Sequence, residues 1–167
     1  MTAGLVVLCG TSFSGKSTVA RALAEQLPAV VVSLDEINER RGLWGGDGIP
    51  VEEWGRTYQL AQAEVLELLS SGTTVVVDDT SSPRFLRDGW RALAVGAGVE
   101  FRLVYVEVDQ AMVRARRDRN RVAPRRRDVA DDVLDQHLAE FEPPGDDEDA
   151  LRVGSVEELG RAWRLGR

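Results

Sequence analysis

Residues 5–18, LVVLCGTSFSGKST, combine a continuous apolar run with a glycine-rich segment and the start of a helical pattern. An apolar run of this length that ends in glycine is typical of a strand buried on both faces of a sheet. After the glycines, Val19, Leu23 and Leu27 recur at the spacing of one helix face. The stretch therefore predicts a buried strand, a glycine loop and a helix in direct succession.

The same alternation of apolar runs and helical patterns continues along the chain. Further strands are predicted at residues 29–34, 73–77, 101–108 and, as a weaker pattern, 150–153. Helical patterns occupy 61–69, 86–97 and 133–141, and loop-rich stretches lie at 42–51 and 142–149. Strands that alternate with helices indicate a parallel sheet covered on both faces. We predict one α/β domain over residues 1–167, a three-layer sandwich with a five-stranded parallel sheet.

The glycine loop has the composition of a binding site for a nucleoside triphosphate. GTSFSGKST (residues 10–18) satisfies the pattern G-x-x-x-x-G-K-[ST] between a predicted strand and a predicted helix. Backbone N–H groups of such a loop surround phosphate oxygens, and the helix N-terminus adds a positive dipole end. The residues expected to contact the nucleotide are Gly10, Thr11, Ser12, Ser14, Gly15, Lys16, Ser17 and Thr18.

Lys16 is the one lysine among the 21 basic residues of the chain. We expect its compact ammonium group to bridge the β- and γ-phosphates, a position that a bulkier planar guanidinium fills poorly. The Ser17 hydroxyl is then placed to ligate Mg²⁺. Asp78, directly after the third predicted strand, is the expected carboxylate partner of that ion. Asp79 is expected on the acceptor side, although it suits a helix cap equally well.

A second carboxylate follows the second predicted strand, in the segment SLDEIN (residues 33–38). Ligands of open parallel sheets gather beyond the carboxyl ends of the strands. Phosphoryl transfer to an alcohol requires a base that accepts the hydroxyl proton, and an aspartate is the usual choice. We therefore expect Asp35 to be the general base.

Opposite charges are concentrated in two consecutive segments. Residues 114–127, here called the arginine segment, hold eight arginines and one aspartate, whereas residues 128–149 hold ten acidic residues and no basic one. Kinases often bring arginines down on a mobile lid that neutralises the transferred phosphoryl group. Arg117 and Arg121 share a helix face and are the expected lid arginines, with ion pairs to the acidic stretch holding the lid open.

These residues together resemble the AAA-type P-loop kinases that include polynucleotide 5′-kinase domains, zeta-toxin-like kinases and seryl-tRNA kinases. The resemblance covers most of the chain and rests on GTSFSGKST, SLDEIN, VVVDDTSSPRFLRDGW, the R-x-x-x-R spacing and FEPP, in this order. It implies a core like that of nucleoside-monophosphate kinases and transfer of the γ-phosphate of ATP, with Mg²⁺, to a hydroxyl. It also supports Asp35 as base and Arg117 and Arg121 as lid residues, and it places Gly154 near the adenine.

The acceptor expected from the sequence is a small molecule. The net charge of −7 disfavours polyanions, and Asn38 stands where polynucleotide kinases carry an arginine that holds an acceptor phosphate. Trp44 and Trp54 suit stacking on an organic acceptor or ordinary packing. His137 is expected to be structural. Two alternatives stay open: a polynucleotide or tRNA 5′-hydroxyl kinase, and a regulatory ATPase without an acceptor.

Two further features bear on location. The single cysteine, Cys9, excludes an internal disulfide and suits a reducing compartment. No segment is apolar over the length that a membrane span needs, and the N-terminal run is too short for a signal peptide. The sequence therefore predicts a cytoplasmic protein without a membrane partner.

Overall fold

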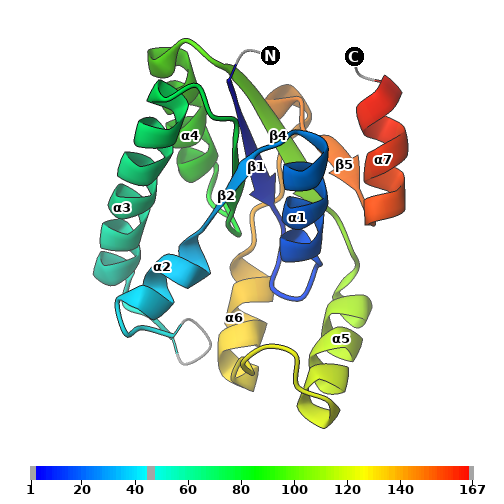
Figure 1. The fold of residues 1–167 in the computed structure, drawn as a ribbon. Coiled ribbons are helices and arrows are strands. Elements are labelled where there is room, and N and C mark those ends of the chain that lie inside the picture. Colours follow the sequence, from blue (N-terminus) through cyan, green and yellow to red (C-terminus); the bar gives the residue numbers. More distant parts are fainter. Residues whose placement is uncertain (1–2, 45–47, 166–167) are drawn as a thin grey trace.

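The computed structural model describes residues 3–44 and 48–165, and these form a five-stranded parallel sheet with helices around it (Figure 1). The strand order across the sheet is β2-β3-β1-β4-β5. The strands are β1 Gly4–Cys9, β2 Val30–Ser33, β3 Val75–Asp78, β4 Glu100–Val106 and β5 Leu151–Val153. The helices are α1 Lys16–Gln26, α2 Leu34–Arg40, α3 Val51–Ser70, α4 Arg84–Ala97, α5 Gln110–Val122, α6 Asp131–Glu140 and α7 Val156–Leu165.

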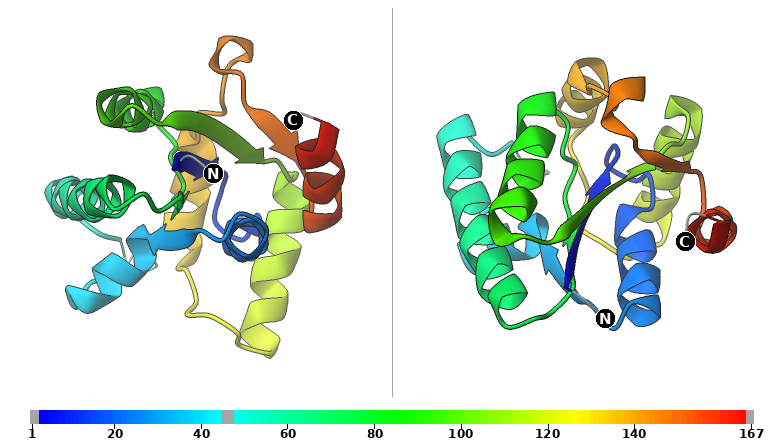
Figure 2. Two further views of the ribbon diagram at one scale, coloured as in Figure 1. Left: turned by 45° about the horizontal axis from the view of Figure 1, so that its top comes forward. Right: turned by 90° about the horizontal axis from the view of Figure 1, so that it is seen from above.

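The predicted α/β sandwich with five parallel strands is confirmed. The right-hand view in Figure 2 shows the sheet between α3 and α4 on one side and α1 and α7 on the other. Alternate residues of β1 point to the two faces: Leu5 and Val7 pack with Val65 and Trp90 of the α3–α4 side. Val6 and Leu8 belong instead to the core under α1 and α7. Both faces of the sheet are therefore buried, as the continuous apolar runs require.

Helices α5 and α6 lie beyond the carboxyl ends of the strands rather than over a sheet face (Figure 1). A third apolar cluster joins them to the glycine loop through Phe13, Val113, Leu134 and Leu138. No helix in the described part of the chain is long and apolar enough to span a membrane.

Several element boundaries differ from the prediction. Leu34, expected in the second strand, begins α2, because the Ser33 hydroxyl caps that helix by accepting a bond from the Glu36 N–H. Helix α3 starts at Val51, ten residues before its predicted start, and α2 and α7 were not predicted as helices. The arginine segment is helical only as far as Val122, two residues before Pro124.

Candidate functional site

A cleft of about 2290 Å³ opens at the carboxyl edge of the sheet. Its walls are the glycine loop, α2, α3, the segment after β3, the arginine segment, α6 and residues 154–157. Pockets for one small ligand typically measure roughly 300–1,000 Å³. The cleft therefore has room for a nucleotide and a second molecule together.

Neighbouring strand ends bring the predicted acidic residues to this cleft. Ser33 of β2 is in register with Asp78 of β3, so the chain that follows each strand emerges at the same edge. The Gly10 N–H donates to the Thr80 oxygen at 3.1 Å, which joins the glycine loop to the segment after β3. Asp35 and Asp78 both line the cleft, as do Asp79 and Thr80.

The glycine loop is closely folded around two glycines. A Cβ atom at Gly10 would lie 2.8 Å from the Val106 oxygen and 2.9 Å from Ser14 Oγ, so no larger residue fits there. Gly15 has a φ of 101° and immediately precedes α1, a conformation that favours glycine. Of the residues expected to contact the nucleotide, Gly10 and Thr11 do not line the cleft. The others line the cleft: Ser12, Ser14, Gly15, Lys16, Ser17, Thr18 and Gly154.

Lys16 lies at the centre of the site. Its Nζ donates to the Thr11 oxygen at 2.7 Å, so the ammonium group is held against the loop. Burial lowers the pKa of Lys16, and the charges of Asp78 and Asp35 act in the opposite direction. A cation that is half-buried and only partly compensated is suited to bind the phosphates of a nucleotide.

The oxygen donors near Lys16 fit a magnesium ion bound together with phosphates. The Ser17 hydroxyl is exposed at the start of α1, and the Asp78 carboxylate is half-buried at the end of the adjacent strand. No cluster of three or more metal-ligating side chains occurs within residues 3–44 and 48–165. Mg²⁺ commonly takes one or two protein oxygens and completes its shell with water and phosphate oxygens. Ser17 and Asp78 supply such a set.

Asp79 differs from its neighbour in its surroundings. Its Oδ2 accepts bonds from the Ser81 N–H at 2.9 Å and the Ser81 hydroxyl at 3.0 Å. Burial raises the pKa of Asp79, and the bonds from Ser81 lower it in part. The side chain therefore both caps the turn before α4 and faces the cleft, so the two readings of Asp79 from the sequence are compatible.

The arginines that line the cleft are not the two expected from the sequence. Arg117 is buried and pairs with Asp118 and Asp131, whereas Arg121 pairs with Asp128 and Asp131. Neither lines the cleft. Ion pairs between the arginine segment and the acidic stretch were expected, and those with Asp128 and Asp131 engage both guanidinium groups outside the cleft lining.

Other arginines of the same segment take the place of Arg117 and Arg121 in the cleft. Arg116 Nη1 donates to the Ser14 oxygen at 2.6 Å and to the Phe13 oxygen at 3.1 Å, so it holds the glycine loop directly. The Arg126 guanidinium lies over the Phe13 ring, 4.6 Å from its centroid. Arg119, Arg125 and Arg127 complete the set of arginines that the arginine segment contributes to the lining.

Trp44 and Trp54, the two tryptophans that could stack on an acceptor, have different surroundings. Trp44 Nε1 donates to the Asp128 oxygen at 3.2 Å, and the Arg127 guanidinium covers its ring at 5.2 Å. Trp44 therefore links the connection between α2 and α3 to the end of the arginine segment. Trp54 of α3 packs against the core and also lines the cleft, so its packing role is confirmed and its contact with an acceptor stays a prediction.

Asn38 faces α3 rather than the cleft. It is 1% exposed, and its Oδ1 accepts a bond from the Thr57 hydroxyl. Arg41 also binds Thr57 and pairs with Glu53. The position at which an acceptor-phosphate arginine was expected is therefore part of the α2–α3 contact.

His137 contacts the glycine loop, which the sequence did not predict. Its Nε2 accepts a bond from the Ser12 N–H at 3.2 Å, across 125 residues of chain. Burial, followed by the charge of Lys16, lowers the pKa of His137 from 6.5 to about 4. The imidazole is therefore neutral at pH 7 and serves as a hydrogen-bond acceptor for the loop.

This contact makes stability depend on pH in a defined window. The folded protein binds the His137 proton only near pH 4, whereas the unfolded chain binds it near pH 6.5. The free energy of unfolding should consequently fall as the pH is lowered through this range, by as much as about 3 kcal/mol from this residue. In H137Q the amide oxygen can accept the Ser12 bond without titrating. Urea denaturation at pH 7 and pH 4.5 should show a smaller loss for the variant; equal losses would contradict the assignment.

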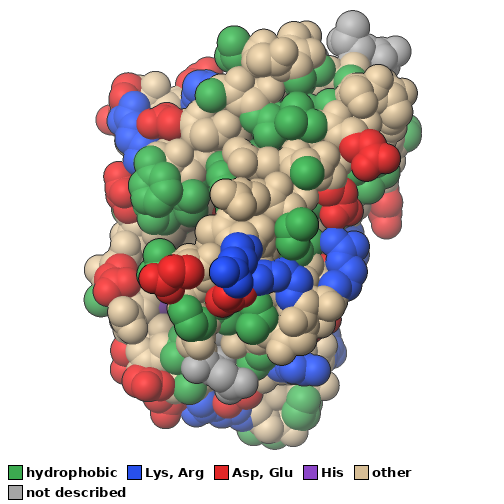
Figure 3. Space-filling model, turned by 90° about the vertical axis from the view of Figure 1, so that its left-hand side faces the viewer, with side chains coloured by type: hydrophobic (Ala, Val, Ile, Leu, Met, Phe, Trp, Pro, Cys, Tyr) green, Lys and Arg blue, Asp and Glu red, His purple; other side chains and the backbone are tan. Residues whose placement is uncertain are grey.

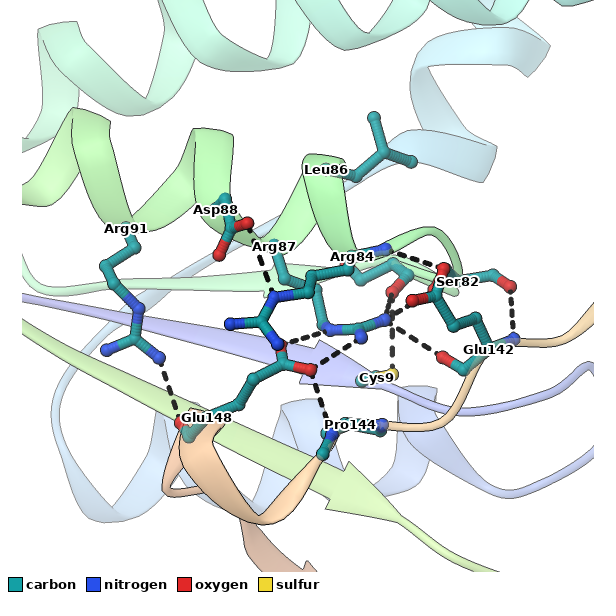
Figure 4. A network of polar contacts seen from close by, with 12 residues as sticks. Cys9, Ser82, Arg84, Leu86, Arg87, Asp88, Arg91, Glu142, Pro144 and Glu148 are labelled. Atoms are coloured by element: carbon teal, nitrogen blue, oxygen red, sulfur yellow. Dashed lines mark hydrogen bonds and ion pairs between the residues drawn. The ribbon is translucent and has the colours of Figure 1, made fainter.

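A buried ion pair fixes the segment that carries the acidic residues (Figure 4). Arg87 of α4 and Glu148 are 1% and 3% exposed, and two bonds of 2.7 Å join their side chains. Arg87 Nη1 also donates to the Ser81 oxygen at 2.9 Å and to the Glu142 oxygen at 2.9 Å. The bonds from Arg87 hold the pKa of Glu148 below its usual range. The pair thus ties the loop after β3 to the loop before β5.

Removing one charge of this pair should be costly, because the other stays buried without compensation. We expect E148Q to lower the free energy of unfolding by about 3–5 kcal/mol. The adjacent Asp147 offers a matched control, since it pairs with Arg84 at the surface and its side chain is 64% exposed. D147N should cost much less, because both partners of its ion pair are exposed to solvent. Urea denaturation of both variants measures the difference; similar losses would show that burial does not distinguish the two pairs.

Comparisons with known proteins support the kinase fold. A family model described as an AAA domain matches residues 5–144. A gluconokinase from Sinorhizobium meliloti 1021 is similar in structure, with a TM-score of 0.71, 25% identity, and coverage of 97% of this chain and 93% of that chain. The Mycobacterium tuberculosis APS kinase CysC, solved with AMPPNP and APS, has a TM-score of 0.71 and 19% identity, with coverage of 98% of this chain and 95% of that chain.

A structure of the Pnkp1/Rnl/Hen1 complex matches less of the chain. Its TM-score is 0.60 at 22% identity, with coverage of 69% of this chain and 39% of that one. No curated protein sequence matches the chain.

The family model spans most of the chain, and the glycine loop stands between β1 and α1. The protein therefore belongs to the AAA domain family and has the fold of its P-loop kinases.

Proposed function

We propose that the protein transfers the γ-phosphate of ATP to a hydroxyl group of a small organic acceptor. The observation that carries the proposal is the position of Asp35 in the same cleft as Lys16, where the charge of the carboxylate acts on the ammonium group. A nucleotide-binding loop with a carboxylate opposite it is suited to transfer to an alcohol rather than to binding alone.

In the proposed reaction, Asp35 accepts the hydroxyl proton as the acceptor oxygen bonds to the γ-phosphorus. The bond from that phosphorus to the β-phosphate oxygen breaks at the same time, and ADP leaves. Lys16 and the cleft-lining arginines stabilise the charge on the phosphoryl group. Mg²⁺, which Ser17 and Asp78 would hold, supplies neutralisation of the β- and γ-phosphate charges when bound.

The arginine segment is the proposed lid. Arg116, Arg125 and Arg126 reach the cleft from it, and the Trp44 contact joins it to the loop between α2 and α3. A lid that excludes water favours transfer to the acceptor over hydrolysis. Gly154, which follows the strand partner of Val106 and lines the cleft, is proposed to lie near the adenine.

A polynucleotide acceptor is less well supported. On the face that carries α2, α3 and α4, basic side chains are interspersed with acidic ones (Figure 3). Arg40 and Arg56 on this face pair with Glu64 and Glu53. A strand of nucleic acid is normally held by an uninterrupted basic surface with aromatic side chains between the charges.

An acceptor screen that follows ADP release tests the function. Nucleosides, neutral sugars, amino alcohols and 5′-hydroxyl oligonucleotides should be compared at equal ATP and Mg²⁺. We expect a small hydroxyl compound to exceed the oligonucleotides at least about tenfold in kcat/KM, a margin of about 1.4 kcal/mol. Efficient labelling of oligonucleotides that falls steeply with salt would instead favour the 5′-kinase. Slow ATP hydrolysis that no acceptor stimulates would favour the regulatory ATPase.

A further inference from the structure

The charged residues of the cleft lining are divided between its two halves. The nucleotide half consists of the glycine loop, α1, the arginine segment and residues 154–157. It contributes all the basic residues of the described lining, namely Lys16, Arg21 and five arginines of the arginine segment, together with two acidic residues, Asp118 and Glu157. The acceptor half consists of α2, α3, the start of α4, the segments that follow β2 and β3, and α6. Every charged residue that it contributes is acidic, namely Asp35, Glu36, Glu39, Asp78, Asp79 and Glu140.

The carboxylates of α2 are not neutralised by the arginines of the same helix. Arg40 pairs with Glu64 of α3 at 2.9 Å, and Arg41 pairs with Glu53. Both arginines are thus engaged with α3, and neither belongs to the cleft lining. Within the described part of the chain, Glu36 and Glu39 form no ion pair, and both side chains are exposed at the cleft. His137 of the same half is neutral at pH 7, because its pKa is lowered to about 4.

Aromatic rings accompany these carboxylates. Trp54, Tyr58 and Phe85 line the acceptor half, and Phe85 is 70% exposed although it is a large apolar side chain. The Tyr58 hydroxyl donates to the Leu86 oxygen at 2.9 Å, which fixes its ring beside the start of α4. Rings of this kind bind apolar surfaces, and they also attract an ammonium group placed over their faces.

We propose that the acceptor is an amino alcohol: a compound whose phosphorylated hydroxyl is accompanied by a protonated amine and an apolar or aromatic body. This inference rests on the proposed function and specifies its substrate class. The ammonium group is attracted by the α2 carboxylates, and the body of the molecule contacts Trp54, Tyr58 and Phe85. An acceptor that bears a phosphate or carboxylate would meet like charges in this half, so the same residues select against it.

Three compounds with one phenylcarbinol skeleton test the charge preference: 2-amino-1-phenylethanol, 1-phenyl-1,2-ethanediol and mandelate. They differ in carrying an ammonium group, a second hydroxyl or a carboxylate. Their dissociation constants should be measured by ligand-observed NMR, with the full-length protein saturated with Mg²⁺ and a non-hydrolysable ATP analogue. We expect the amine to bind at least about tenfold more tightly than mandelate, the diol to be intermediate, and the difference to narrow as salt is added.

A charge-matched pair of double variants locates the preference. E36Q/E39Q removes two carboxylates from the acceptor half, and E52Q/E67Q removes two exposed carboxylates of α3 that do not line the cleft. The amine-to-mandelate ratio should fall at least about threefold in the first variant and stay unchanged in the second. Equal affinities, absence of binding, tighter binding of mandelate, or the same change in both variants would overturn the proposal. Because the readout is binding, it is independent of the ADP-release screen that tests the kinase function.

Discussion

Replacing Lys16 with alanine is expected to lower phosphate transfer at least about 10³-fold and to weaken ATP binding. The ammonium group is held at the loop by the Thr11 oxygen, 2.7 Å from Nζ, and it is the only lysine of the chain. Its pKa is lowered by burial, so the folded protein expends free energy to keep this cation in place. A bound phosphate would compensate the Lys16 charge and recover that free energy. Removing the ammonium group should therefore have a large effect on both ATP binding and phosphate transfer.

K16R should also fail, although it keeps the charge. The loop is wrapped closely around the lysine stem, and a Cβ atom at Gly10 would already lie 3.4 Å from Lys16 Cδ. The planar guanidinium therefore has no matching space between the loop and the phosphates. R161A removes one exposed basic residue of α7 outside the cleft, and it is the control for the positive charge that K16A loses. ADP release measures turnover, titration with a fluorescent ATP analogue measures ATP affinity, and thermal melting measures stability. Near-normal turnover of K16R would contradict the argument.

The strands and the glycine loop were predictable because their signals are local. Val75–Val77 and Leu5–Cys9 are unbroken apolar runs, and only a strand buried on both faces needs such a run. The loop pattern occupies nine consecutive residues, and strand ends of a parallel sheet meet at one edge. Asp35 and Asp78 could therefore be assigned to the same cleft without knowledge of the strand order.

The helical segments that the prediction missed differ in the strength of their local signals. Helix α2 has seven residues and buries only Leu34, Ile37 and Asn38, which is too little periodicity to distinguish it from a loop. The first half of α3 contains Gly55 and is largely exposed. Helix α7 does bury Leu159 and Trp163 at helical spacing, so this pattern was available in the sequence.

The choice of lid arginines depended on which face of α5 is turned toward the cleft. Helical spacing groups Arg117 with Arg121, but it cannot distinguish the inner face from the cleft face. The buried residues of α5 are Val113, Arg117 and Asn120, so Arg117 belongs to the face that packs inward and pairs with Asp131.

The contacts of His137 with Ser12 and of Arg87 with Glu148 join residues 125 and 61 positions apart. Such pairs are a property of the tertiary fold and have no local signal.

Replacing Asp35 with asparagine is expected to lower kcat by about 10²–10⁴-fold while the affinity for ATP stays close to that of the wild type. Asparagine keeps the size and polarity of the side chain but cannot accept the hydroxyl proton. Asp35 stands in the first turn of α2, exposed at the cleft, and it neither caps a helix nor forms an ion pair among the described residues. The substitution should therefore leave the fold intact, which thermal melting would verify.

Asp79 is the alternative base, and the pH dependence of the rate separates the two residues. Because burial raises the pKa of Asp79, a reaction that needs its ionised form would begin to lose rate on acidification at a higher pH than for an ordinary aspartate. Its carboxylate also accepts two bonds from Ser81, so D79N should disturb the turn before α4 and lower stability as well as rate. If D35N lost ATP binding instead of turnover, Asp35 would hold the metal or the fold, and the proton would have to pass to Asp79. A D35N variant that binds ATP normally, is inactive and melts like the wild type leaves Asp35 as the group that takes the proton.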